Sequence, residues 1–254
     1  MTGLRGLTGM PVVLTGGGSG IGRAIALRLA DEGARVGILD LDASGGAETE
    51  AAIRAAGGVA NAYGVDITDY AAVEAAVEAF TGAEGEVRGL VNCAGWDVAS
   101  DFLDSDPELW RKVIDINLVG PLNVTKVVLS RMALAEAGRI VSIASDAGRV
   151  GSSGESVYAA CKGGIVAFSK SVAREMARRG ISLNVVSPGP TDTPLFADFD
   201  ASGRLAKALE RAIPMGRLAR PDDFPGLVAF LLSDDAAFIT GQTISVSGGL
   251  TMHG

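Results

Sequence analysis

The sequence predicts a single α/β domain built on a doubly wound parallel sheet of seven strands, with helices on both faces. Short apolar runs alternate with longer amphipathic or alanine-rich segments along the whole chain. The apolar runs are nearly continuous, which is typical of parallel strands that are buried on both faces. A glycine-rich turn follows the first run, and this counts against a closed eight-stranded barrel, which is the rival fold.

Each strand is predicted from one apolar run. In chain order the runs are PVVLT (11–15), RVGILD (35–40), VANAYGVD (59–66), RGLVNCAG (88–95), GRIVSIAS (138–145), ISLNVVSPG (181–189) and QTISVSGG (242–249). Seven such strands make one doubly wound domain over residues 1–254 rather than two smaller domains.

The segments between the strands predict helices, and several of them end at glycine, which is favoured just after the last helical residue. In chain order they cover residues 20–33, 47–58, 69–80, 107–120 with its continuation, 155–180 and 221–235. Residues 190–220 are the one irregular region, between the sixth strand and the last helix. A loop that long in a compact fold is usually functional, and we expect it to be a substrate lid.

Composition argues against several classes of protein. A net charge of −8 and a pI near 4.7 argue against a nucleic-acid-binding surface. The two cysteines, Cys93 and Cys161, make no disulfide framework and fit a reducing compartment. The N-terminal segment lacks the apolar core of a signal peptide, and no uninterrupted apolar run approaches the roughly 20 residues that cross a bilayer. We therefore expect a cytoplasmic protein without a membrane partner.

The turn TGGGSGIG (15–22) lies between the first strand and a helix. Glycine there permits a tight turn, and the helix N-terminus offers amides and a positive dipole end to a phosphate. Glycines also serve ordinary strand-to-helix turns, but the order of strand, turn and helix favours a dinucleotide site of the Rossmann type. The cofactor contacts expected from this turn are Gly16, Gly18, Ser19, Gly20, Ile21 and Gly22.

Asp40 ends the second predicted strand, 18 residues after the last glycine of that turn. A carboxylate at this place accepts hydrogen bonds from the adenosine ribose and repels a 2′-phosphate. Neither Ser19 nor Leu41 supplies the positive charge that a 2′-phosphate would need. The alternative is a solvated strand end, which the glycine turn before Asp40 disfavours. Asp40 and the missing basic partners make NAD, in preference to NADP, the expected cofactor.

The stretch SVYAACKGG (156–164) places Tyr158 four residues before Lys162. On a helix the two side chains lie on one face, one turn apart. An ammonium beside a phenol favours the phenolate and draws the pKa of the tyrosine toward neutrality, which would make a general base. Tyrosine and lysine at this spacing also occur as ordinary surface packing. Ser145, at the end of the fifth predicted strand, lies at the same rim of the sheet as the pair.

Several motifs occur together and in one order: TGGGSGIG, NCAG, INLVG around Asn117, Ser145, the Tyr158–Lys162 pair and SPGPTDTP. In these the chain resembles the classical short-chain dehydrogenase/reductase family over essentially its whole length. One departure is Cys93, where the family usually repeats asparagine.

The resemblance implies a catalytic set of Asn117, Ser145, Tyr158 and Lys162. Tyr158, as phenolate, takes the proton of a substrate alcohol, and Ser145 binds the reacting oxygen. Lys162 lowers the pKa of the tyrosine and holds the nicotinamide ribose, and Asn117 supports a water in the proton relay. The scheme needs no metal, and we expect His253, the only histidine, in a solvent-facing tail.

Further cofactor contacts are expected at the carboxyl ends of the strands, beside Asp40, Leu41, Tyr158 and Lys162. They are Asp66, Ile67, Asn92, Ala94, Gly95, Pro188, Gly189, Thr191 and Thr193. The resemblance also implies a homotetramer. A non-catalytic regulatory protein that binds NAD is the alternative from another class, but such a protein should have lost Ser145, Tyr158 or Lys162.

The expected substrate is an acyl-CoA. Residues 195–220 carry five basic and three acidic residues, a net charge of 5 − 3 = +2 in a chain of net charge −8. This local positive charge would suit the phosphates of CoA, with Arg204 and Arg211 as contacts. Charge counting leaves open an amphipathic lid helix with a solvated charged face.

Within the family, NCAGWD, IASDAGRVGSSGESVYAACKGG, SPGPTDTPL and the ending SVSGGLTMHG look very like 2-hydroxycyclohexanecarboxyl-CoA dehydrogenases. That likeness implies NAD-dependent oxidation of a hydroxyl beta to a thioester, on a ring lined by Trp96, Ser145 and Asp146. Trp96 and Asp146 could also be packing or capping residues. The alternative enzyme is a 3-oxoacyl-carrier-protein reductase.

Overall fold

The computed structural model describes residues 3–199 and 204–252. Four residues of the expected lid, 200–203, and the tail residue His253 lie outside the described residues.

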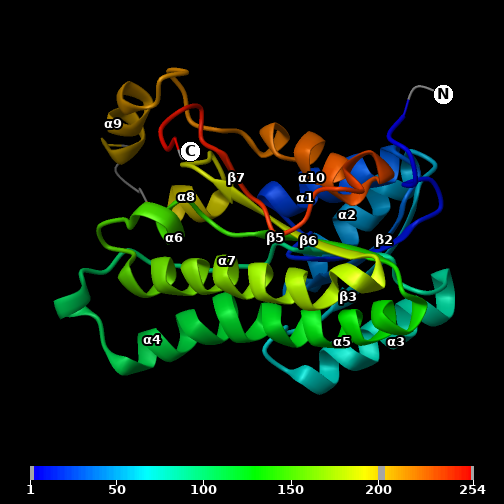
Figure 1. Cartoon of the computed structure of the whole chain (residues 1–254). Helices are drawn as coiled ribbons and strands as arrows, with labels where there is room; N and C mark the ends of the chain where they lie inside the picture. The colour runs from blue at the N-terminus through cyan, green and yellow to red at the C-terminus, as the bar shows by residue number, and fades with distance from the viewer. Residues whose placement is uncertain (1–2, 200–203, 253–254) are drawn as a thin grey trace.

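The seven predicted strands are confirmed, and they form one parallel sheet in the order β3-β2-β1-β4-β5-β6-β7 (Figure 1). Their bounds are β1 Pro11–Thr15, β2 Arg35–Asp40, β3 Val59–Gly64, β4 Gly89–Asn92, β5 Gly138–Ile143, β6 Ile181–Pro188 and β7 Thr243–Val246. Thr15 is in register with Leu39 on one side and with Asn92 on the other. The chain segments that leave these three strands therefore start side by side, at the carboxyl edge of the sheet.

Several strands are shorter than their apolar runs, and the difference falls at this edge. The predicted strands 59–66, 88–95 and 138–145 end two or three residues earlier in the structure, at Gly64, Asn92 and Ile143. The residues beyond those points leave the sheet ladder and line the cavity described below. Hydrophobic pattern alone does not distinguish a paired strand residue from the residue that follows it.

Helices cover both faces of the sheet, as predicted (Figure 1). On one face lie α1 (Gly20–Asp31), α2 (Ala43–Ala55) and α10 (Pro225–Leu232). On the other lie α3 (Tyr70–Glu84), α4 (Pro107–Ile114), α5 (Gly120–Ala135) and α7 (Ser156–Met176). An apolar core fills the space on each side. Typical members are Ile25, Leu29 and Val228 on the first side, and Val73, Phe80, Val124 and Met132 on the second.

The start of α2 differs from its prediction. The helix begins four residues early, at Ala43, because the Asp42 carboxylate accepts a hydrogen bond from the amide of Ser44 at 3.0 Å. An aspartate at this position satisfies one of the amides that the first turn leaves unpaired.

The predicted helix 107–120 and its continuation contain an irregularity. Helices α4 and α5 are joined without a break by one π-helical turn, Asp115–Val119. Turns of this kind widen the helix locally and are frequent at functional sites. Asn117, which is fully buried, lies on this turn.

The continuous helical run Pro107–Ala135 is long and apolar enough to cross a bilayer by length and composition alone. The run is interrupted by charged residues such as Arg111, Lys112 and Asp115, so it is not the uninterrupted apolar run that the sequence was expected to lack. In the structure, 44% of its most apolar stretch of 18 residues is buried. The run packs against α3 and α7, as one of the helices that cover the sheet.

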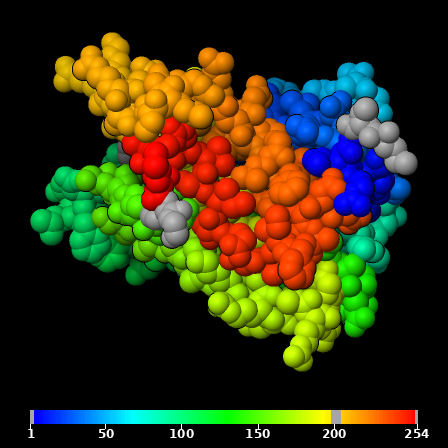
Figure 2. All heavy atoms as spheres, turned by 45° about the horizontal axis from the view of Figure 1, so that its top comes forward, coloured from blue at the N-terminus to red at the C-terminus, as the bar shows by residue number. Residues whose placement is uncertain are grey.

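The irregular region 190–220 contains two short helices in the described part, α8 (Pro194–Phe199) and α9 (Arg204–Ala212). The C-terminal segment lies against the end of this region: the amide of Met215 donates to the carbonyl of Gly248 at 3.1 Å. In Figure 2 the red C-terminal segment lies beside the orange segment that carries α9. The described part of residues 190–220 and the C-terminal segment thus form one cover over the carboxyl edge of the sheet.

Candidate active site

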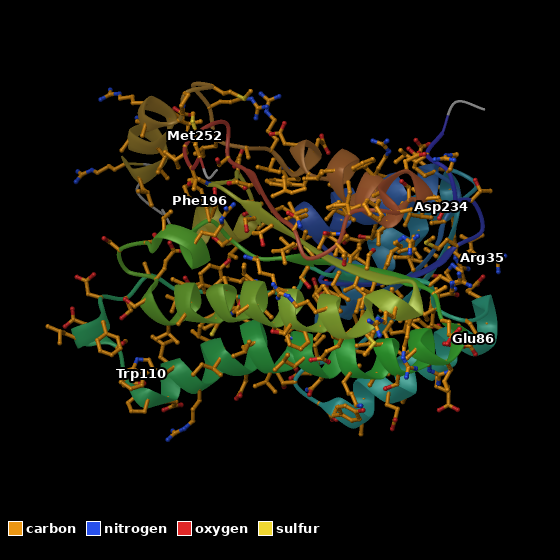
Figure 3. All side chains as sticks on the ribbon, viewed as in Figure 1. Arg35, Glu86, Trp110, Phe196, Asp234 and Met252 are labelled. Carbon is orange, nitrogen blue, oxygen red and sulfur yellow. The ribbon has the colours of Figure 1, made fainter. Side chains whose placement is uncertain are left out.

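A cavity of about 860 Å³ lies between the carboxyl edge of the sheet and the lid. Figure 3 shows Phe196 and Met252 at this end of the molecule, opposite Arg35, Glu86 and Asp234. The position is the one that open α/β sheets use for ligands, because the chain order reverses between β1 and β4.

The glycine turn is locked to the segment after β4. Thr15 Oγ1 accepts hydrogen bonds from the amides of Cys93 and Ala94, both at 3.1 Å. Gly16 has φ +71°, and a Cβ there would lie 2.7 Å from Ala94 Cα. A Cβ on Gly22 would lie 1.9 Å from the Gly16 carbonyl oxygen. Side chains at either glycine would therefore push the turn away from the sheet.

The start of α1 fits a dinucleotide phosphate. Ser19, its N-cap residue, makes no side-chain capping bond, and the first turn holds no acidic residue. The first amides of α1 thus keep their donors for a ligand, and the helix dipole adds a partial positive charge. Ser19, Gly20 and Gly22 line the cavity at this point.

The Asp40 carboxylate organises the adenosine end of the cavity. Its Oδ2 accepts from the amide of Gly18 at 2.7 Å, and its Oδ1 accepts from the amide of Asp42 at 2.9 Å. Leu41 beside it is 74% exposed and carries no charge. Arg23 is held by α2, since its Nε donates to Thr49 Oγ1 at 2.9 Å and its guanidinium pairs with a glutamate there. The described surroundings of Asp40 therefore hold no cation aimed at a 2′-phosphate.

The structure brings most of the predicted site residues together on the walls of this cavity. From the cofactor prediction these are Gly16, Ser19, Gly20, Ile21, Gly22, Asp40, Leu41, Asp66, Ile67, Ala94, Gly95, Pro188, Gly189, Thr191 and Thr193. From the catalytic and substrate predictions they are Ser145, Tyr158, Lys162, Trp96 and Asp146.

Three further predicted residues, Gly18, Asn92 and Asn117, lie behind the cavity wall. Gly18 holds Asp40, as described, and the Asn92 amide donates to Thr125 Oγ1 at 2.9 Å on α5. The Asn117 side chain accepts from the Trp96 amide at 3.2 Å and donates to the Trp96 carbonyl at 2.6 Å. In the described structure these three residues support the wall and do not line the ligand space.

The lid faces the cavity with apolar side chains. Leu205 and Leu209, one turn apart on α9, line the cavity, whereas Arg204 and Arg211 on the same helix do not. In the structure α9 is thus an amphipathic helix whose charged face points away from the cavity. The expectation that Arg204 and Arg211 line the substrate site is corrected, because neither lines this cavity. The physical reason is that α9 turns Leu205 and Leu209 toward the cavity, which they line while staying partly exposed.

Trp96 and Asp146, both expected at the ring pocket, line the cavity. The Asp146 side chain also has a packing role, because it is buried and accepts a hydrogen bond from the Ser245 hydroxyl on β7. Trp96 remains at the cavity, and its ring carries the Lys112 ammonium 3.9 Å from the ring centroid.

Ser145, Tyr158 and Lys162 meet at the inner end of the cavity. The Lys162 ammonium is buried, donates to the Ile143 carbonyl at 3.2 Å, and lies 5.4 Å from the centroid of the Tyr158 ring. Burial lowers the pKa of Lys162 to about 8. The first turn of α7 and the end of β5 thus bring an ammonium, a phenol and a hydroxyl into one small volume.

The pKa of Tyr158 is raised well above its ordinary value, contrary to the expectation of a phenolate near neutrality. Burial is the main cause, and the negative charges of Glu155 and Asp97 add to it. Hydrogen bonding with Ser145 acts in the other direction without offsetting them. In the protein without its cofactor, Tyr158 is therefore a phenol at neutral pH, and it is suited to giving a proton.

Sequence reasoning missed Asp97 and Glu155, which line the cavity close to Tyr158, and the inward leucines of α9. Asp97 directly follows the NCAGW segment, but no short motif marks it as a site residue. Asp97 and Glu155 lie together at the cavity although they are far apart in the chain, and sequence spacing alone cannot reveal such a contact.

Comparison with known proteins agrees with this geometry. The family described as enoyl-(acyl carrier protein) reductase matches residues 16–251. The chain is 38% identical over 251 residues to the 3-oxoacyl-[acyl-carrier-protein] reductase FabG of Escherichia coli, covering 96% of this chain and 98% of that protein. It is also 38% identical over 245 residues to 2-(S)-hydroxypropyl-CoM dehydrogenase 3 of Xanthobacter autotrophicus, with 94% and 96% covered.

Among solved structures, an actinorhodin polyketide ketoreductase variant with NADPH superposes with a TM-score of 0.93 at 34% identity, covering 96% of this chain and 98% of that chain. The likeness thus extends over nearly the whole fold. The chain belongs to the classical short-chain dehydrogenase/reductase family, and it is an oxidoreductase that acts on hydroxyl and keto groups with a nicotinamide cofactor.

Proposed function

We propose that this protein uses NAD(H) to interconvert a 3-oxoacyl thioester and the corresponding 3-hydroxyacyl thioester. The observation that carries the proposal is the position of Ser145, Tyr158 and Lys162 at the inner end of the cavity whose other end holds the glycine turn and Asp40.

Proton transfer at the keto oxygen falls to Tyr158. Ser145 hydrogen-bonds that oxygen and orients it, while the phenol of Tyr158 donates its proton. The cofactor, when bound, supplies the hydride to the keto carbon, so that one hydride and one proton convert the ketone to a secondary alcohol. The Lys162 ammonium stabilises the phenolate that remains, and a proton from solvent restores the phenol. In the reverse direction the same residues take the proton of the alcohol.

The cofactor proposal rests on Asp40. Its carboxylate lines the cavity beside the glycine turn, where it would accept hydrogen bonds from ribose hydroxyls and repel a 2′-phosphate. The actinorhodin ketoreductase was solved with NADPH, so members of this family differ in cofactor. The neutral Leu41 and the occupied Arg23 support NAD for this chain.

The substrate proposal places an open-chain 3-oxoacyl thioester first, as in the FabG relative. Two observations support reduction: Tyr158 is a phenol at neutral pH, and the apolar lid suits an acyl chain. Oxidation of 2-hydroxycyclohexanecarboxyl-CoA is the second candidate, because the Trp96 ring lines the substrate half of the cavity. That substrate also carries a hydroxyl group at the position beta to a thioester.

The remaining expectations follow from the family. We propose a cytoplasmic homotetramer that binds small molecules and neither nucleic acid nor membrane. Sedimentation at micromolar concentration checks the assembly, and a stable monomer would contradict it.

The function is tested by assaying 3-oxobutanoyl-CoA and 2-oxocyclohexanecarboxyl-CoA with NADH and with NADPH. We expect thioester reduction with NADH. The kcat/KM with NADPH should be lower by about tenfold or more, because tenfold corresponds to a charge repulsion of roughly 1.4 kcal/mol. In Asp40→Ala the gap between the two cofactors should narrow. Equal efficiency with both cofactors in the native protein would contradict the cofactor proposal. Faster turnover of free ketones than of thioesters would contradict the substrate proposal.

A further inference from the structure

Few positive charges line the main cavity. Among the described residues they are Lys112 and Lys162. Lys162 is buried and donates to the Ile143 carbonyl at 3.2 Å, so it is engaged at the reacting end. Arg204 and Arg211 of the lid do not line the cavity. Lys112 is therefore the cation that the cavity wall offers to an anionic part of a substrate.

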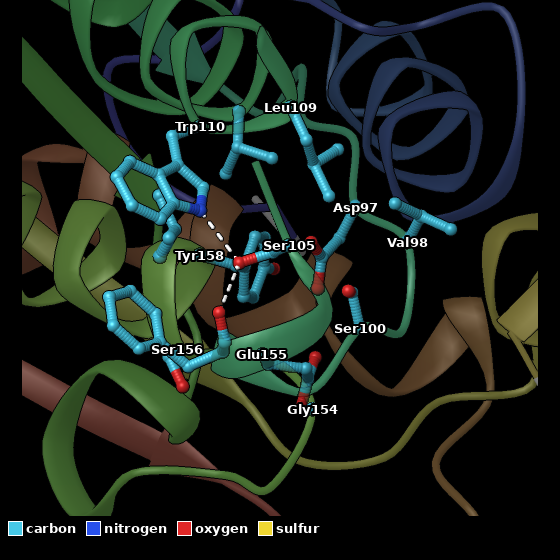
Figure 4. Close-up of a pocket in the computed structure, with 13 residues that line it drawn as sticks. Asp97, Val98, Ser100, Ser105, Leu109, Trp110, Gly154, Glu155, Ser156 and Tyr158 are labelled. Carbon is cyan, nitrogen blue, oxygen red and sulfur yellow. Dashed lines mark hydrogen bonds between the residues drawn. The ribbon is translucent and has the colours of Figure 1, made fainter. Parts of the chain in front are cut away.

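Lys112 lies on the helix that borders the reacting half of the cavity. Lys112 and Ile116 are one turn apart, on α4 and the π-helical turn after it, and both line the main cavity. Leu109 and Trp110, also on α4, wall a smaller cavity that Tyr158 borders from the other side (Figure 4). This smaller cavity leaves about 20 Å³, room for about one water molecule. The same helix thus reaches Tyr158 with one face and carries the ammonium beside it.

The Trp96 ring holds the Lys112 ammonium in place. The ammonium nitrogen lies 3.9 Å from the ring centroid, and the face of an indole attracts a cation. Trp96 is itself fixed, because the buried Asn117 side chain accepts from its amide at 3.2 Å and donates to its carbonyl at 2.6 Å.

No carboxylate competes for this ammonium within the described chain. The ion pairs there all use cations other than Lys112. A ring face accepts no conventional hydrogen bond, so the three N–H donors of the ammonium stay available to a ligand. Lys112 is also exposed, which gives a ligand access from the mouth of the cavity.

We propose that Lys112, positioned by Trp96, binds a phosphate on the arm that carries the thioester. The inference rests on the proposed function, in which the substrate is a 3-oxoacyl thioester. In acyl-CoA and in acyl-carrier protein alike, a pantetheine arm joins the thioester to a phosphate. The start of α1 would meet the phosphates of the dinucleotide, so Lys112 is left for this one. A lysine pairs with phosphate as a point charge, which suits the end of a flexible arm.

The test compares native protein and Lys112→Gln on the 3-oxobutanoyl thioesters of pantetheine, 4′-phosphopantetheine and CoA. The KM for the CoA ester should rise by about three- to fivefold in the variant, since an exposed charge pair is weak. The KM for the pantetheine ester, which has no phosphate, should not change. A rise that is already present with phosphopantetheine supports the phosphate that CoA shares with carrier protein. A rise with CoA alone supports binding of its other phosphates.

Two control variants separate charge at this place from charge in general. Lys126→Gln removes an exposed lysine from the same helical run that lines neither cavity, and it should match native protein. Lys112→Arg keeps the charge and should stay within about twofold of native KM. Added salt should raise the KM for the CoA ester more in native protein than in Lys112→Gln, because salt screens an exposed pair.

An unchanged KM for the CoA ester in Lys112→Gln would overturn the inference and leave the proposed function standing. So would an equal rise with and without a phosphate, or a rise confined to the KM for NADH. If native protein reduces no thioester, the proposed function fails, and calorimetric titration of CoA into the NADH-bound protein decides the inference alone. Weaker CoA binding in Lys112→Gln than in Lys126→Gln would support it, and equal binding would overturn it.

Discussion

Burial sets the proton affinities of the two side chains that carry the chemistry. It lowers the pKa of Lys162 to about 8 and raises that of Tyr158, because the interior disfavours the charged form of each group. A tyrosine and a lysine one turn apart are therefore not enough to make a phenolate. Burial is the largest cause of the raised pKa of Tyr158, and the charges of Glu155 and Asp97 add to it.

The same physics predicts a pH-dependent stability for Asp97→Asn. The Asp97 pKa is about 7 in the folded protein and about 3.9 in an unfolded chain, so folding favours its protonated form. The stability that this contributes is fully present below about pH 4 and is lost as the pH rises through 7. Asparagine does not titrate. We expect the Tm of Asp97→Asn, relative to native protein, to be higher by a few degrees at pH 8.5 than at pH 5.

Thermal unfolding at the two pH values, with Asp104→Asn as the control, measures this difference. A relative Tm that is the same at both pH values would show that Asp97 is not protonated in the folded state.

Residues fixed by a short motif were accessible to sequence reasoning. The glycine turn, Asp40 and the Tyr158–Lys162 pair each follow a strand or begin a helix, so their place at the carboxyl edge follows from the topology. The acidic pair was not accessible, because Asp97 and Glu155 meet only when the segment after β4 folds onto the start of α7.

Among the elements, the lid shows where sequence reasoning reached its limit. Charge counting found the excess of positive residues in 195–220, but the direction of a helix face depends on what the helix packs against. Leu205 and Leu209 repeat at helical spacing and line the cavity, so the basic residues Arg204 and Arg211 lie on the other side of the helix. Strand ends were overextended for a related reason: the apolar runs continue into the segments that line the site.

The inward face of α9 predicts the effect of lid substitutions. Leu205→Ala with Leu209→Ala should raise KM for a 3-oxoacyl thioester by about tenfold, which corresponds to ~1.4 kcal/mol of lost apolar contact. Arg211→Ala, on the outer face of the same helix, should leave KM within about twofold. Steady-state kinetics on both variants checks this. A larger rise in KM in Arg211→Ala than in the leucine variant would contradict this account and would indicate that the basic residues of α9 contact the substrate.

In the molecule as a whole, the doubly wound sheet divides the cavity into a half that would bind the dinucleotide and a half that carries the reacting groups. The turn after β1 and the end of β2 form the dinucleotide half of the cavity, while the segments after β4 and β5 and the start of α7 form the reacting half. The order of the strands places the two halves side by side, because β1 and β4 are neighbours in the sheet although β2 and β3 lie between them in the chain. The alternation of apolar runs with helical segments, together with the glycine turn, was enough to predict the doubly wound parallel sheet.

The central claim is that this fold binds NAD(H) at one end of the cavity and transfers a proton through Tyr158 at the other. The most direct measurement compares native protein and Tyr158→Phe for NADH binding, by fluorescence titration, and for reduction of a 3-oxoacyl thioester. Loss of the phenol proton should leave the Kd for NADH within a few-fold and lower kcat by about 10²–10⁴-fold. A Tyr158→Phe protein that binds NADH and keeps a near-native kcat would contradict the assignment.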